Sequence, residues 1–89
     1  MSILSKLFGK KSAPAHASED YNGFRITPQP IAEVGSYRIS AKIEKEIGGE
    51  LKVHEMIRAD TTTSEDEAVA SSVRKAKVFI DQMGDKLFG

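Results

Sequence analysis

The sequence predicts an α+β fold in which a three-stranded antiparallel meander packs one face against a single C-terminal helix (β-β-β-α). Apolar and polar residues alternate along residues 36–47 and, less regularly, along residues 21–28 and 51–58. This period of two is typical of half-buried strands. After residue 64, apolar residues recur at steps of three and four, which is the spacing of one helix face. We therefore expect residues 20–89 to form one β-β-β-α domain.

Residues 1–8 are predicted to form a short amphipathic helix, followed by a flexible linker over residues 9–19. The linker is small, polar and aperiodic. Helices shorter than ~12 residues are marginal in water, so the first segment needs a surface on which to lie. Two interpretations stay open, a disordered tail or a helix that docks weakly on a membrane or protein through its apolar side chains, Ile3, Leu4, Leu7 and Phe8.

The three predicted strands each place apolar residues on one face. In the first strand, Phe24 and Ile26 share a face, and Pro28 and Pro30 end the strand and favour a sheet edge. The second strand, residues 36–47, gives the cleanest alternation, with an apolar face of Tyr37, Ile39, Ala41, Ile43 and Ile47. In the third strand, residues 51–58, the apolar residues Leu51, Val53 and Ile57 are expected to face the core.

The turn between the second and third strands decides which face of the third strand is buried. A two-residue loop of Gly48 and Gly49 would turn His54 and Arg58 toward the core, which is costly for polar groups. A loop extended by Glu50 keeps the apolar residues of both strands on one face. We therefore predict the three-residue loop, with one glycine in the left-handed region.

The predicted helix has clear start and stop signals. The spacing of Ser64 and Glu67 is that of a capping box, in which the serine hydroxyl accepts a backbone N–H bond at the first turn. Gly84 is expected just past the end of the helix, and Leu87 and Phe88 are expected to pack back from the tail. The apolar stripe of the helix consists of Val69, Val73, Ala76, Ile80, Met83 and Leu87.

The face of the sheet away from the helix is the candidate binding surface. A basic sheet face can bind phosphates of DNA or an acidic protein surface. The alternative is that these are ordinary solvated strand residues paired with nearby acids. Because one helix leaves this face uncovered, a homodimer or a partner protein is also expected there. The basic residues assigned to it are Arg25, Arg38, Lys42, His54 and Arg58.

Composition argues against an enzyme and against bound cofactors or metals. The chain has no cysteine, and its two histidines, His16 and His54, lie far apart in sequence, so no metal-ligand spacing is present. We find no catalytic constellation, and the two glycines at residues 48–49 suit a hairpin rather than a phosphate loop. We predict a non-enzymatic protein without a cofactor.

The location predicted from the sequence is the cytoplasm. No apolar run approaches the roughly 18 residues that span a bilayer. The N-terminal apolar patch is interrupted by Ser5 and Lys6, so it lacks the apolar region of a signal peptide.

Short ordered motifs over nearly the whole chain resemble the small bacterial HlyU-type family, named for a haemolysin transcriptional activator. The opening residues 4–9 and 21–24 are similar to that family, as are the runs 57–60, 66–68, 75–77, 80–81 and 84–88. The resemblance implies a small transcriptional activator or regulator that acts directly on DNA or through a partner. It carries no catalytic or ligand residues. The alternative function is an adaptor that docks through the N-terminal helix and holds a partner on the open sheet face.

Overall fold

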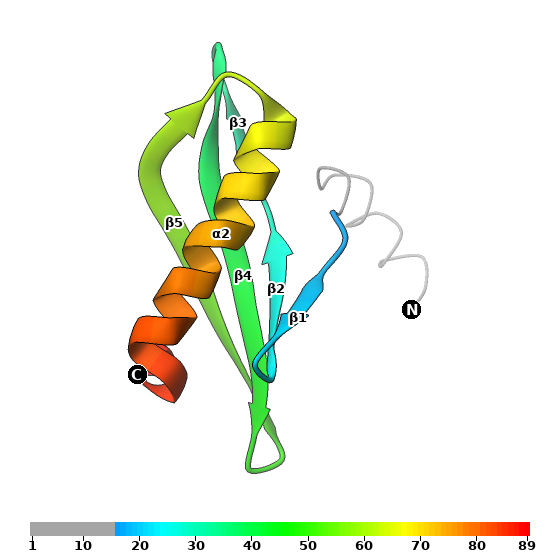
Figure 1. Cartoon of the computed structure of the whole chain (residues 1–89), viewed down its shortest axis with the longest axis vertical. Coiled ribbons are helices and arrows are strands. Elements are labelled where there is room, and N and C mark those ends of the chain that lie inside the picture. Colours follow the sequence, from blue (N-terminus) through cyan, green and yellow to red (C-terminus); the bar gives the residue numbers. More distant parts are fainter. Residues whose placement is uncertain (1–15) are drawn as a thin grey trace, which may run out of the picture.

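The computed structural model describes residues 16–89, which form one antiparallel sheet and one long helix (Figure 1). The predicted helix over residues 1–8 lies outside the described residues. In chain order the elements are β1 (Glu19–Tyr21), β2 (Phe24–Pro28), β3 (Ile31–Glu33), β4 (Ser36–Ile47), β5 (Glu50–Thr62), α2 (Glu65–Met83) and the 3-10 helix η1 (Gly84–Phe88).

The sheet has five strands, so the predicted three-stranded meander is wrong. β4 is central: β2 and β3 pair with different stretches of one edge of it, β5 pairs with the other edge, and β1 extends the sheet beyond β2. The two missed strands, β1 and β3, have three residues each, too few to show periodicity. β1 also begins at Glu19, within the range predicted to be linker. Its turn to β2 uses Asn22 and Gly23, both with positive φ.

The core lies between α2 and one face of the sheet. Ile26 of β2 and Ile43 of β4 are paired in register and fully buried, which confirms the predicted faces of these two strands. The remaining members of the core come from every larger element and from η1: Phe24, Ala41, Met56, Ala76, Ile80 and Leu87.

The β4–β5 hairpin turns through two residues, and the predicted three-residue loop is wrong. Ile47 pairs with Glu50 and Ile43 with His54. Gly48 and Gly49 have φ values of 62° and 80°. Two consecutive positive φ values are the requirement of the type I′ turn, whose twist matches that of the flanking strands. Turn chemistry therefore outweighed the apolar pattern.

The shorter loop inverts the faces of β5 relative to the prediction. Met56 is 5% exposed and belongs to the core, whereas Leu51, Val53 and Ile57 are 60%, 48% and 59% exposed. The expected cost of turning His54 toward the helix is reduced because its ring stays half-exposed and lies 5.3 Å, centroid to centroid, from the Phe79 ring of α2.

The helix ends follow the sequence signals. The Ser64 hydroxyl accepts from the Glu67 N–H at 3.2 Å, which confirms the N-cap. Gly84 is the C-cap, with φ 57°, and its N–H donates to the Ile80 carbonyl. In η1, Leu87 is buried and Phe88 stacks on Phe24 with ring centroids 6.0 Å apart. The predicted return of the tail onto the core is therefore confirmed.

Candidate interaction surface

The open face of the sheet, away from α2, carries a row of exposed apolar side chains on β5. We call Leu51, Val53 and Ile57 the β5 stripe. In register across β4, the three residues face Glu46, Glu44 and Ser40 respectively. Alternate residues of a strand point to the same face, so Glu55 lies in the same row, opposite Lys42. The stripe is thus apolar and bordered by carboxylates.

Two of the predicted basic residues, Arg25 and Lys42, lie on this open face. Arg25 is in register with Glu44, and its Nε lies 3.7 Å from a carboxylate oxygen of Asp20. The Lys42 Nζ lies 3.9 Å from the Glu44 carboxylate. Because each base has an acid beside it, these residues form a mixed-charge surface and not a continuous basic one.

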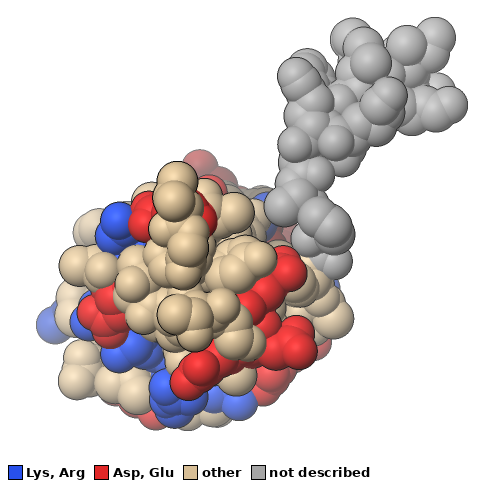
Figure 2. Space-filling view, turned by 90° about the horizontal axis from the view of Figure 1, so that it is seen from above, with Lys and Arg blue, Asp and Glu red and all other residues tan. Residues whose placement is uncertain are grey.

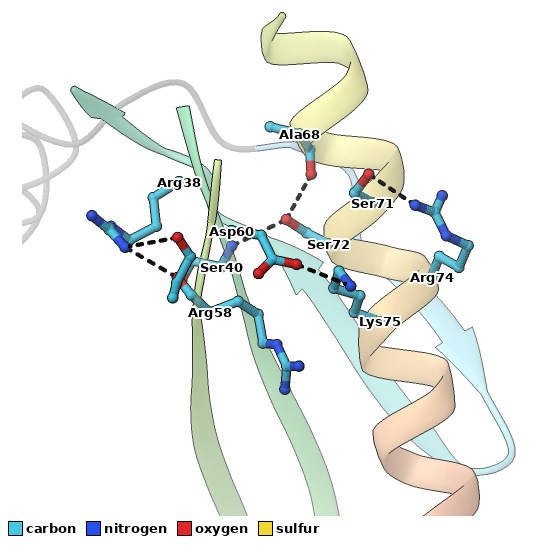
Figure 3. Close-up of polar contacts among 10 residues, drawn as sticks. Arg38, Ser40, Arg58, Asp60, Ala68, Ser71, Ser72, Arg74 and Lys75 are labelled. Carbon is cyan, nitrogen blue, oxygen red and sulfur yellow. Dashed lines mark hydrogen bonds and ion pairs between the residues drawn. The ribbon is translucent and has the colours of Figure 1, made fainter. Parts of the chain in front are cut away.

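Arg38 lies at a bulge, where the pairing of β4 with β5 becomes irregular (Figure 3). Its Nε lies 2.7 Å from the Glu33 carboxylate. Its Nη1 donates to the carbonyl oxygens of Arg58 and Ala59 at 3.3 and 3.4 Å. These contacts direct the guanidinium to the backbone of β5 and to Glu33 of β3, so its position is explained by the fold.

The structure does not bring the five predicted basic residues together. Arg25 and Lys42 share the open face, Arg38 contacts the backbone of exposed Arg58 at the bulge, and His54 lies on the opposite face beside α2. The predicted N-terminal docking residues lie outside residues 16–89.

Sequence reasoning also missed a buried polar contact that fastens α2 to the bulge. The Ser72 hydroxyl accepts from the Ser40 backbone N–H at 3.1 Å and donates to the Ala68 carbonyl at 2.7 Å (Figure 3). Both serines are buried. Ser40 stays in register with Ile57 beside the bulge, and the helix supplies an acceptor for its buried backbone N–H. Sequence alternation alone gives no signal for such a bulge.

Basic residues of α2 have partners on neighbouring strands or within the helix itself. The Lys75 Nζ lies 3.1 Å from Asp60 of β5, and the Lys77 Nζ lies 2.6 Å from Glu19 of β1. The Arg74 guanidinium donates to the Ser71 hydroxyl at 3.0 Å. The first turn of the helix carries three acids. Seen from this end, Asp and Glu lie among Lys and Arg, without a continuous basic surface (Figure 2).

The charge of the described residues is negative. Three of the thirteen Lys and Arg lie in residues 1–15, which contain no Asp or Glu, so residues 16–89 carry ten bases and thirteen acids. Such a balance gives no long-range attraction to polyanions.

A hydrogen bond between a tyrosine and a carboxylate also joins the sheet to the helix. The Tyr21 hydroxyl donates to Asp81, with both carboxylate oxygens at 2.9 Å. This hydrogen bond is the main reason that the pKa of Tyr21 is raised above its ordinary value, because it favours the neutral phenol. The Lys77 Nζ lies over the same ring, 5.3 Å from its centroid.

Within residues 16–89, no cluster of three or more His, Cys, Asp or Glu is placed to hold a metal ion. The helices in that part of the chain are also too short or too polar to cross a membrane.

These features define a small α+β protein whose most distinctive surface is suited to contacts with another macromolecule. The chain belongs to the family described as transcriptional activator HlyU, whose model matches residues 2–88. This confirms the family resemblance seen in the sequence and places the chain among small transcriptional regulators. Comparisons with curated proteins and with solved structures gave no match.

Proposed function

We propose that this protein regulates transcription in the cytoplasm through a protein partner that docks on the β5 stripe, and not through its own contacts with DNA. The observation that carries the proposal is the exposure of Leu51, Val53 and Ile57, at 60%, 48% and 59%, on one uncovered sheet face. Apolar side chains gathered on a surface favour a macromolecular contact.

The charges around the stripe indicate the chemistry of the partner. Glu44, Glu46 and Glu55 border the apolar residues, and Lys42 is the base opposite Glu55. Complementary charge fixes register and suppresses wrong partners. We therefore expect a partner surface with apolar side chains flanked by Lys or Arg.

The same charges disfavour a direct contact with DNA. Affinity for DNA comes largely from Lys and Arg that neutralise phosphates, whereas residues 16–89 have three more acids than bases. The N-terminus of α2, which would otherwise attract an anion, begins with Glu65, Asp66 and Glu67. A major groove reader presents basic and amide side chains instead.

A pair of matched substitutions tests the role of the stripe. Val53→Lys places a charge in the stripe, and Val78→Lys places the same charge on the outer side of α2, where Val78 is similarly exposed at 50%. We expect cells that produce the Val53 variant to lose the transcript changes restored by the wild-type gene, and cells with the Val78 variant to keep them. Equal circular dichroism and thermal midpoints control for folding. Full regulation by the Val53 variant would contradict the proposal.

A second candidate function is an adaptor that docks through the N-terminal segment. The observation that favours it is the uneven distribution of charge along the sequence. Residues 1–15 contain Lys6, Lys10 and Lys11 and no acid, whereas residues 16–89 have more acids than bases. Basic residues near apolar ones suit an anionic membrane surface or an acidic protein. Deleting residues 1–11 should then change the fractionation of the protein between membrane and soluble material. Unchanged fractionation would remove this candidate.

A further inference from the structure

The β5 stripe combines exposed apolar side chains with acids that are free to meet a cation. α2 contacts β2, β4 and β5 from the other face of the sheet, so the stripe faces away from the helix. Glu46 and Glu55 lie beside the stripe, and none of the ion pairs formed within residues 16–89 involves either carboxylate. Such a surface favours a ligand that carries both apolar side chains and positive charge.

The first eleven residues of the same chain, which we call the N-terminal segment, have this complementary composition. The first acid of the chain is Glu19, so the charge of the segment is positive throughout. It has three lysines, and residues 16–89 have three more acids than bases. Its large side chains include the apolar Ile3, Leu4, Leu7 and Phe8 and the basic Lys6, Lys10 and Lys11.

The described part of the chain begins within reach of the stripe. The Ser18 hydroxyl lies 2.7 Å from that of Thr27, and Thr27 and Glu55 are in register with Lys42 on its two sides. Neighbouring strands lie about 4.8 Å apart, so Ser18 is roughly 15 Å from β5 across the sheet. β1, which follows Ser18, and β5 are opposite edges of the lower part of the sheet (Figure 1).

The connection between the segment and the domain is long enough for this distance. His16 lies at the start of α2, where its Nε2 is 3.4 Å from the Glu65 carboxylate. Residues 9–15 span up to about 23 Å when extended. Residues 3–8 can therefore lie over the open face between β4 and β5.

We propose that the N-terminal segment docks on the β5 stripe of its own chain. Its apolar side chains cover Leu51, Val53 and Ile57, and its lysines face Glu46 and Glu55. A short tether gives an effective concentration on the order of millimolar, so a contact too weak to form between separate molecules still forms within one chain. This is the argument for the chain's own segment over a second copy.

The covered stripe deepens the proposed function and takes its regulatory meaning from it. A partner that docks on the stripe must first displace the segment, so its apparent affinity is lowered in proportion to the fraction of chains whose stripe is uncovered. The segment thus acts as an internal competitor that sets the threshold for partner binding. The docking itself requires no partner and is tested on the purified protein.

Paired cysteines in the full chain test the docking. The chain has no native cysteine, so Leu7→Cys with Val53→Cys gives one thiol on each side of the proposed contact. The control combines Leu7→Cys with Val78→Cys, because Val78 is similarly exposed, at 50%. Val78 lies about 20 Å along α2 from Glu65, the partner of His16, and is therefore also within reach of the tether.

Under mild oxidation in dilute solution, the Val53 pair should close an intramolecular disulfide about tenfold faster than the Val78 pair, because docking raises the local thiol concentration. Equal circular dichroism spectra control for folding. Equal closure rates would overturn the proposal. Disulfides between chains in place of those within one chain would overturn it as well, since they would make a second copy the occupant.

Charge reversals test the chemistry of the contact. Replacing Lys6, Lys10 and Lys11 by Glu in the Val53 pair should slow closure to the rate of the Val78 pair, because like charges then meet on the open face. Adding Glu46→Lys and Glu55→Lys to that variant should restore the faster rate. A closure rate that none of these reversals changes would overturn the assigned role of the lysines.

The covering and the partner docking fail in different experiments. Regulation lost in the Val53→Lys variant, together with equal closure rates for the two cysteine pairs, would support the partner and reject the covering. Faster closure of the Val53 pair, together with full regulation by the Val53→Lys variant, would support the covering and reject the partner.

Discussion

The Ser72 side chain links the helix to the sheet through a buried hydrogen bond. Ser72→Ala would leave the buried N–H of Ser40 without its acceptor, and an unsatisfied buried donor costs about 1–3 kcal/mol. We expect the free energy of unfolding in urea to fall by that amount. The matched control is Ser71→Ala, since Ser71 is also buried but its hydroxyl accepts from the exposed Arg74 side chain and not from a buried backbone N–H. Equal losses for the two variants would contradict this account of the bulge.

Tyr21 gives the protein a pH-dependent contribution to stability. Its hydrogen bond to Asp81 raises the pKa of the folded phenol above the ordinary value of 10.0, so the unfolded chain loses this proton at a lower pH than the folded one. The contribution is complete below about pH 10 and declines as pH rises through the folded pKa.

Tyr21→Phe isolates this effect, because the aromatic ring beneath Lys77 is kept while the hydroxyl is removed. The difference in urea midpoint between wild type and variant should be constant near neutral pH and should shrink above about pH 10. A difference that grows with rising pH would show that the hydroxyl contact has the opposite sign.

Local signals predicted individual residues well where the partner lies close in sequence. The Ser64 cap and the Gly84 stop depend on backbone groups three or four residues away, and both predictions are confirmed. The role of Arg38 could not be predicted, since its partners lie across the bulge, at Glu33, Arg58 and Ala59.

The β4–β5 hairpin is the element that determines which surface the protein exposes. The sequence contained its determinant, two adjacent glycines that permit a type I′ turn. The apolar alternation of β5 pointed to the other register because Leu51, Val53 and Ile57 outnumber Met56. The two signals conflict because the exposed residues are apolar, which is the feature that we assign to binding.

Substitutions at Gly48 test the turn. Its φ is +62°, and no atom lies within 4 Å of a Cβ built there, so the cost of a side chain is conformational. Gly48→Val should lower the free energy of unfolding by about 1–2 kcal/mol. Gly48→Asn should cost less, since Asn-Gly is a favoured type I′ pair. Equal unfolding free energies for the two variants would contradict the assigned turn.

The short strands β1 and β3 escaped prediction for a different reason. Each is only three residues long and is stabilised by pairing with a longer neighbour, β2 or β4. The Asn22-Gly23 pair is a hairpin signal from which the turn between β1 and β2 could have been predicted. The exposed strand β3 has no periodic pattern from which it could be predicted. His54 and Arg58 do not join Arg25 and Lys42 on the open face because the prediction assigned the faces of β5 the wrong way round.

At the scale of the whole molecule, the acidic charge of the domain and its apolar stripe favour regulation of transcription through a protein partner over regulation through direct contact with DNA. A regulator that contacts DNA must supply phosphate-binding cations, whereas one that acts through a protein requires a surface such as the stripe. Most Lys and Arg side chains described above lie beside acids of the same chain. The account therefore assigns DNA contact to the partner.

Fluorescence anisotropy of the purified full chain against labelled duplex DNA, titrated across salt, tests this claim most directly. Duplexes from the promoters whose transcripts respond to the gene are the appropriate probes, with an unrelated duplex as control. The account predicts no rise in anisotropy even at low salt, where phosphate contacts are strongest. Binding that is tight at low salt and weakens steeply as salt rises would show direct phosphate contacts and contradict the account.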